Sequence, residues 1–206
     1  MSIDWMSILV IWLPQIFVAA VLAIACLWYL KPQWLSKLKI PPENLLKNLL
    51  IATLTFRLFY PFVLSFAQYN LWSKDPFSQY FLPPHQPLNY FLLYVWGRFW
   101  LESVLALAVA GLFWAFLYLI QKNRTGFWTK DDLFLAALLA ILTGWPDVIV
   151  FLVLVCLYTL LLSLVRLIIF KQTHTQLTSA LIIAAIITLL AGDKLINLTG
   201  LKVLLI

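Results

Sequence analysis

Long runs of apolar residues, separated by short polar segments, cover almost the whole chain, and none alternates apolar and polar residues as a half-buried strand does. A helix needs about 20 apolar residues to cross the hydrocarbon core of a membrane. The pattern therefore predicts an all-α bundle of about six transmembrane helices, the fourth of them short for a span. The expected helices cover roughly residues 8–30, 45–68, 89–120, 130–143, 147–170 and 177–191.

The polar segments add detail to this outline. Thr129 can cap a helix whose first turn holds Asp131 and Asp132, where acidic side chains interact favourably with the helix dipole. Residues 69–88 are rich in aromatic residues and proline, and we expect a long loop that lies along the membrane interface or binds a membrane protein partner. Gly192 and the two charged residues after it predict the end of the last helix, before an apolar tail over 195–206.

Composition agrees with a membrane protein. Of the 206 residues, 64% are hydrophobic and 11% are charged, whereas soluble domains carry about 25% charged residues. We therefore expect one transmembrane helical domain over residues 1–206. Cys26 and Cys156 lie inside apolar runs, so a disulfide framework is not expected. The net charge of +6 indicates basic cytoplasmic loops rather than a nucleic-acid partner.

Arg57 is the first candidate functional residue, because it lies near the middle of the second expected span. A charged side chain at the centre of a bilayer costs roughly 2.5–3.5 kcal/mol or more, and such residues usually mark a cavity or a partner. Two partners are consistent with the sequence: the head group of an anionic lipid, or Glu102 in a structural ion pair. Tyr60 follows three residues later and is expected on nearly the same helix face.

Arg98 and Glu102 form the second candidate feature, one helical turn apart at the start of the third expected span. They either orient this helix at the membrane surface or form a polar site that faces the bundle interior. Gly97 beside them would allow a ligand or another backbone to approach closely. Glu102 is the only candidate for a catalytic base.

Other types of site are not indicated. Asp131 and Asp132 are interpreted as the N-terminus of a helix rather than a catalytic pair, because adjacent helical residues point about 100° apart. His85 and His174 are both expected in exposed loops. No metal-ligand spacing, phosphate-binding glycine loop, nucleophilic triad or nucleic-acid motif occurs, so we expect neither a metal nor a cofactor.

The segment from Lys39 to Tyr60, with its Phe-Arg-Leu-Phe-Tyr end, resembles the bacterial prolipoprotein diacylglyceryl transferase family. Residues 96–103 and 126–133 fall where that family has two further motifs, and Asp132 matches the family's aspartate. The resemblance covers about residues 35–145. It implies a multi-pass protein of the bacterial cytoplasmic membrane with a lipid-accessible cavity around Arg57, and phosphatidylglycerol as the lipid.

The chain departs from that family at the positions that carry the chemistry. Glu102 occupies the position of the family's histidine, and residues 144–149 lack the arginine and asparagine of its signature. The resemblance therefore implies lipid binding by Arg57, Tyr60, Arg98 and Glu102, with altered or lost transferase chemistry. Whether the protein is an enzyme is left open by the sequence.

The C-terminal half is also similar to type IV prepilin peptidases, over residues 131–147 and again over 189–193. The glycines that precede the peptidase aspartate are missing before Asp131, and no second aspartate lies in an earlier span. This resemblance therefore ranks below the first. A hypothesis from another class is a non-catalytic membrane scaffold or complex subunit that uses the aromatic segment 69–88.

Basic residues predict the orientation of the bundle. Nine of the 14 Lys and Arg residues lie in 31–47, 122–130 and 166–171, and cytoplasmic loops carry such an excess. Six spans would then place both termini outside.

Single cysteines can test this orientation in intact cells with a thiol reagent that does not cross membranes. Cysteines introduced at Ser36 and Thr125 should resist labelling, because both lie in basic segments expected inside, and one at Ser78 should react. All three should react after the cells are permeabilised. Labelling of Ser36→Cys or Thr125→Cys in intact cells would show that the orientation is wrong.

Overall fold

The computed structural model describes residues 12–30, 42–123, 129–170 and 177–200, and nearly all of these residues are helical, with no strand among them. This confirms the all-α class. Two π-helical turns continue helices, Trp96–Trp100 from α5 into α6 and Arg166–Phe170 after α8, and a 3-10 turn, Ser78–Phe81, follows α4. The α-helices are α2 (Leu13–Leu30), α4 (Pro42–Lys74), α5 (Leu88–Val95), α6 (Leu101–Asn123), α7 (Lys130–Thr143), α8 (Asp147–Val165) and α9 (Leu177–Thr199).

Within the described ranges, five helical segments are long and apolar enough to cross a membrane, as in a multi-pass membrane protein. They are Leu13–Leu30, Asn44–Lys74, Leu88–Asn123, Asp147–Ile168 and Leu177–Thr199. The fourth expected helix, α7, has 14 residues. At ~1.5 Å per residue it measures about 21 Å, which is too short for a core of about 30 Å.

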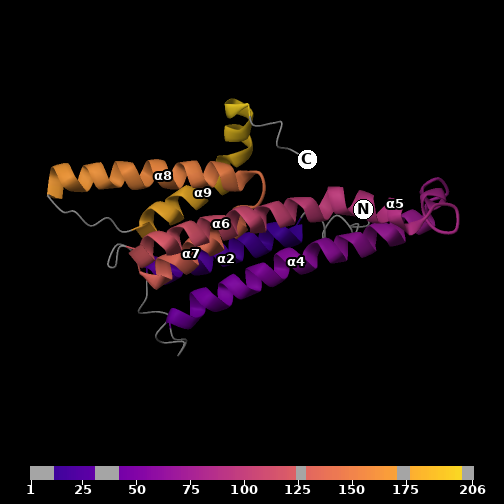
Figure 1. Cartoon of the computed structure of the whole chain (residues 1–206), viewed down its shortest axis with the longest axis horizontal. Helices are drawn as coiled ribbons and strands as arrows, with labels where there is room; N and C mark the ends of the chain where they lie inside the picture. Colours follow the sequence, from indigo (N-terminus) through magenta and orange to yellow (C-terminus); the bar gives the residue numbers. More distant parts are fainter. Residues whose placement is uncertain (1–11, 31–41, 124–128, 171–176, 201–206) are drawn as a thin grey trace.

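Helix α7 forms the centre of the bundle, in contact with α2, α4, α6, α8 and α9 (Figure 1). Every residue from Leu135 to Thr143 is buried. A helix that is apolar on all sides can be stable only when other helices surround it. Three alanines, Ala136, Ala137 and Ala140, let the neighbouring helices approach closely.

Asp132 joins the N-termini of α7 and α9. Its carboxylate accepts hydrogen bonds from the Thr129 backbone N–H at 3.0 Å and from the Thr129 hydroxyl at 2.8 Å. The Thr178 hydroxyl, in the first turn of α9, donates to the other carboxylate oxygen. Thr129 in turn accepts from the Asp132 backbone N–H, which completes a capping box and confirms the expected cap.

The predicted loop over residues 69–88 is wrong in its first part, because α4 continues to Lys74. The ring of Trp72 packs against Phe91 at 5.5 Å and Tyr94 at 4.8 Å between ring centroids, so these aromatic residues hold α4 against α5. After α4, the Ser78 N–H donates to Asp75 at 2.8 Å, and bonds from Ser78 lower the pKa of Asp75. The end of α4, the turn after it and α5 form a hairpin, which projects beyond α7, α8 and α9 (Figure 1).

The last helix also continues further than predicted. Gly192, Asp193 and Lys194 lie inside α9 rather than at its end, and α9 reaches Thr199. A glycine in a helix interior costs roughly 0.5–1 kcal/mol relative to alanine, so packing must offset this cost. Residues 201–206 of the expected apolar tail lie outside the described residues.

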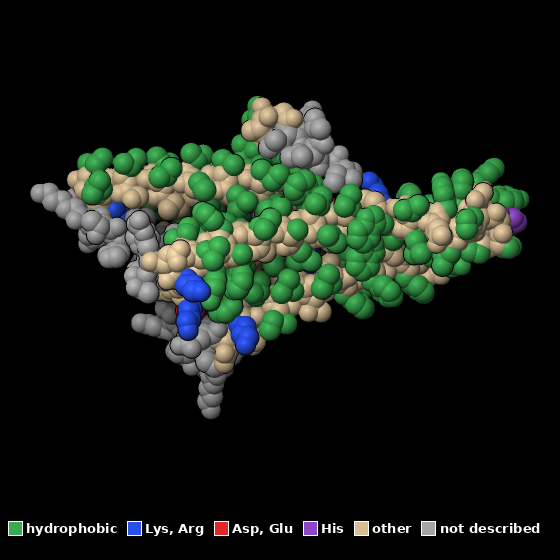
Figure 2. Space-filling model, viewed as in Figure 1, with side chains coloured by type: hydrophobic (Ala, Val, Ile, Leu, Met, Phe, Trp, Pro, Cys, Tyr) green, Lys and Arg blue, Asp and Glu red, His purple; other side chains and the backbone are tan. Residues whose placement is uncertain are grey.

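Apolar side chains cover most of the surface that Figure 2 shows, while Lys and Arg side chains gather mainly at the end where α4 begins and α6 ends. Cys26 and Cys156 are free, and His85 is exposed. His174 and the loop positions Ser36 and Thr125 lie outside the described residues, as does the start of the first expected helix before residue 12.

Replacement of Asp132 should destabilise the bundle. Asp132→Asn places an amide group against the donors of Thr129 and Thr178, and we expect a loss of about 1–3 kcal/mol in the free energy of unfolding, as for other buried groups left without partners. Asp131→Asn, the same change at the less buried neighbour, should cost less, because water still reaches the side chain at this position. Denaturation in detergent micelles measures both, and equal losses would contradict the role of Asp132.

Candidate functional site

Arg57 caps the C-terminus of α7. Its Nε donates to the carbonyl oxygen of Ile141 at 3.2 Å, and its Nη2 donates to that of Leu142, also at 3.2 Å. The last carbonyl groups of a helix have no partner within the helix, and they carry a partial negative charge that attracts a cation. The half-buried Arg57 and the end of α7 therefore satisfy each other, and Nη1 takes no part in these two bonds.

The backbone has a special feature on each side of this contact, Gly144 after α7 and Pro61 inside α4. Gly144 has φ +76°, and a Cβ built there would lie 3.2 Å from Cζ of Arg57 and closer still to Nη2. Glycine is therefore required at this turn for its conformation and for space. On α4, Pro61 follows Arg57 by four residues and provides no N–H, so the carbonyl of Arg57 loses its usual helical hydrogen bond.

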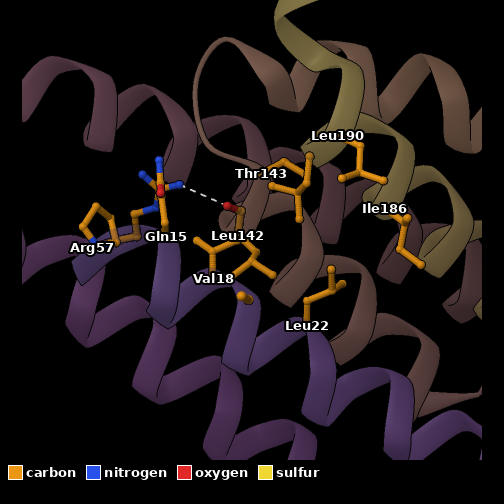
Figure 3. Close-up of a pocket in the computed structure, with 11 residues that line it drawn as sticks. Gln15, Val18, Leu22, Arg57, Leu142, Thr143, Ile186 and Leu190 are labelled. Carbon is orange, nitrogen blue, oxygen red and sulfur yellow. Dashed lines mark hydrogen bonds between the residues drawn. The ribbon is translucent and has the colours of Figure 1, made fainter. Parts of the chain in front are cut away.

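Arg57 lines a cavity of about 500 Å³ between α2, α7 and α9. Figure 3 shows Arg57 and Gln15 at one end of it and Ile186 and Leu190 of α9 at the other. Gln15, Arg57 and Thr143 are its polar lining residues, and the remainder are apolar: Pro14, Val18, Ala19, Leu22, Leu142, Ile186, Leu189 and Leu190. Leu190 is 82% exposed, so the cavity opens to the outside of the bundle.

A second, polar pocket of about 250 Å³ lies on the other side of the α7–α8 turn. Its exposed rim consists of Arg98, Glu102 and Asp193, and its half-buried floor includes Asp147. The remaining lining residues are Gly97, Trp145 and Pro146. Three carboxylates and one guanidinium make this pocket acidic when all four groups are ionised.

The residues singled out from the sequence are thus divided between two places. Arg98 and Glu102 line the same pocket, as their spacing indicated, but they are exposed and no ion pair joins them. Glu102 interacts electrostatically with Arg57 and with Tyr60 without a direct ion pair to Arg57. Arg57 has instead the α7 carbonyl groups as partners, which neither of the two expected alternatives contained.

Tyr60 does not line the Arg57 cavity. Its ring stacks on Phe56, with 5.3 Å between ring centroids, and Phe56 stacks on Phe17 of α2 at 4.0 Å. This row of rings packs α2 against α4 beside Arg57. Tyr60 therefore belongs to the packing around the site, close enough to Arg57 to interact with its charge.

Sequence reasoning did not single out Asp147 or Asp193 as site residues. Asp147 lies in the first turn of α8, and its Oδ1 is buried without a hydrogen-bond partner. This oxygen packs against Gly192, where a Cβ would lie 2.9 Å from the carboxyl carbon. Their position next to apolar runs could have marked both aspartates as candidates, but only the fold shows that they share one pocket.

Gly97 lines the polar pocket with no heavy atom within 4 Å of a Cβ built on it, so the space beside it is open. Among the described residues, no group of three or more His, Cys, Asp or Glu side chains is arranged to hold a metal ion. The Arg57 cavity thus offers one cation for binding, and the polar pocket offers carboxylates.

Comparison with protein families, curated proteins and solved structures finds no match for this chain.

Two glycines give a matched test of the packing at Asp147. Gly192→Ala inserts a methyl group against the Asp147 carboxylate, and we expect it to lower the free energy of unfolding by about 1–3 kcal/mol, as overpacking does. Gly97→Ala meets no atom and should leave stability unchanged or slightly raised, because alanine favours helices. Denaturation in detergent compares the two, and a Gly192→Ala variant as stable as Gly97→Ala would contradict the close contact.

Proposed function

We propose that this chain is a multi-pass protein of the bacterial cytoplasmic membrane that binds an anionic amphiphile of the phosphatidylglycerol class in the cavity beside Arg57. The acyl part would lie along the apolar wall between α2 and α9. The anionic group would lie at the guanidinium, beside Gln15.

One observation carries this proposal: an open, largely apolar cavity has a single cation at one end. Ligand pockets typically measure about 300–1,000 Å³ and combine apolar walls with a few polar groups. The cavity of about 500 Å³ falls within this range. An anionic oxygen can accept from Nη1 of Arg57, which the two bonds to α7 leave out.

The polar pocket is less suited to an anionic ligand. Glu102, Asp147 and Asp193 together would repel a phosphate more than Arg98 attracts it. The candidate base Glu102 also lines this pocket and not the Arg57 cavity. Binding without transfer of a diacylglyceryl group is therefore the function that the geometry supports best.

A second candidate function, a scaffold for another membrane protein, is favoured by the aromatic hairpin. Phe77 is 84% exposed and Leu93 is 72% exposed, although the neighbouring Trp72 is packed. Exposed apolar groups at the projecting end suit an apolar partner or the membrane interface. Mass spectrometry of the intact protein from native membranes would distinguish the two functions, because it reports bound lipids and bound proteins together.

The peptidase-like alternative has less support. Proteolysis of that type needs two carboxylic acids that share one site and exchange a proton. The resemblance matches the peptidase aspartate to Asp131, which lies in the first turn of α7 and lines neither pocket. Asp147 and Asp193 share the polar pocket at the opposite end of α7, so this pocket does not include the aspartate on which the resemblance rests.

Lipid selectivity tests the proposed function. The purified protein in nanodiscs should retain phosphatidylglycerol in preference to phosphatidylcholine, and Arg57→Gln should weaken this preference about tenfold or more, since a charge-assisted hydrogen bond contributes about 1.5–3 kcal/mol. Ala19→Phe, which fills the cavity without changing Arg57, should also weaken it.

Arg98→Gln is the matched control, because it removes a cation from the polar pocket and leaves the Arg57 cavity intact. Native mass spectrometry measures the lipid bound to each variant. Equal retention of both lipids by the unmodified protein, or full selectivity in Ala19→Phe, would contradict binding in this cavity.

A further inference from the structure

The turn between α7 and α8 forms part of the wall of both pockets. Leu142 and Thr143 line the Arg57 cavity, and the three residues from Trp145 to Asp147 line the polar pocket. Only Gly144 separates the two sets along the chain. A movement of this turn therefore changes both pockets at once.

Arg57 holds the turn from the side of the cavity. Its two hydrogen bonds end on Ile141 and Leu142, and its guanidinium lies against the backbone of Gly144. Figure 3 shows the bond to Leu142 at the edge of the cavity. The group that would attract an anionic ligand is thus the same group that holds the turn in place.

On the other side, the turn is connected to α8 and α9. The Val148 N–H donates to the Gly144 carbonyl at 2.6 Å, and the Ile149 N–H donates to that of Pro146 at 3.1 Å. Asp147 lies between these bonds and packs on Gly192 of α9. Displacement of Gly144 would therefore move the Asp147 carboxylate, whose Oδ1 has no hydrogen bond that holds it.

We propose that an anionic ligand bound at Nη1 of Arg57 also accepts from Nη2, draws it away from the Leu142 carbonyl and releases the Gly144–Pro146 turn, so that occupancy of this cavity alters the polar pocket. An anionic oxygen accepts a stronger hydrogen bond from a guanidinium than a neutral carbonyl does. Two discrete arrangements of one turn are enough to couple two sites energetically. The ligand-dependent step rests on the proposed function, whereas the contact between Arg57 and the turn does not.

Hydrogen–deuterium exchange of the full chain in nanodiscs tests the coupling, with phosphatidylcholine discs compared with discs that also contain phosphatidylglycerol. Residues 142–150, which include the Val148 and Ile149 amides, should exchange several-fold faster with phosphatidylglycerol. The hairpin segment 77–86 provides the matched control, because its turn bonds, such as Leu82 N–H to Gln79 at 3.1 Å, have no connection to Arg57. Its exchange should stay unchanged.

Two variants test the contact without any ligand. Arg57→Gln should raise exchange over 142–150 in phosphatidylcholine discs, because the turn loses its two bonds. Gly144→Ala keeps the charge and should do the same by displacing the guanidinium. Gly200→Ala is its control, because Gly200 also has a positive φ, +73°, but no atom lies within 4 Å of a Cβ there.

The outcomes separate the two proposals. Bound phosphatidylglycerol with unchanged or slower exchange over 142–150 would overturn the coupling and leave the proposed function standing. Absence of any preference for phosphatidylglycerol would overturn the proposed function and the ligand-dependent step together. Unchanged exchange in both Arg57→Gln and Gly144→Ala would show that Arg57 does not hold the turn.

Discussion

The bonds from the Arg57 guanidinium to the last carbonyl groups of α7 are the contact on which the bundle depends. A cation buried among apolar helices is costly, and so is a helix end buried without partners. In this protein the two groups compensate each other, because α4 supplies the charge and the C-terminus of α7 supplies two hydrogen-bond acceptors. The helix dipole adds to the attraction, because its negative end points at the guanidinium.

This contact allows a helix of only 14 residues to lie at the centre of a membrane protein. Backbone polar groups inside a bilayer must be satisfied within the protein. Asp132 and the two threonines bonded to it satisfy the N-terminal end of α7, and Arg57 satisfies the C-terminal end. With both ends held, the chain can turn at Gly144 and return as α8.

The position of the turn explains why polar groups collect around it. Helix α8 begins there with Asp147, and α9 passes with Gly192 and Asp193. Close packing of α8 on α9 needs a residue without a side chain opposite Asp147, and Gly192 provides it. The result is an apolar cavity with one cation on one side of the turn and a small acidic pocket on the other. The proposed function and the proposed coupling both follow from this arrangement.

The sequence by itself determined the features that depend on neighbouring residues. Apolar runs of sufficient length predicted the helices, and Thr129 with Asp132 predicted the start of α7, because a cap is formed within four residues. It also marked Arg57 as a charge that needs a partner. The course of α4 beyond Gln68 and of α9 beyond Ala191 was not predictable, because packing at Trp72 and Gly192 overrides the local signals of a loop and of a helix end.

Only the tertiary structure decided which groups meet. Arg57 bonds to residues 84 and 85 positions away along the chain, and the sequence alone offered a lipid or Glu102 as the partner. Asp147 and Gly192 likewise come together from different helices. Side-chain type and local spacing show that a buried charge requires compensation, but the angles at which helices pack decide which group supplies it. The short length of α7 was predicted from the sequence, but only the packing of five other helices around it makes it the core of the bundle.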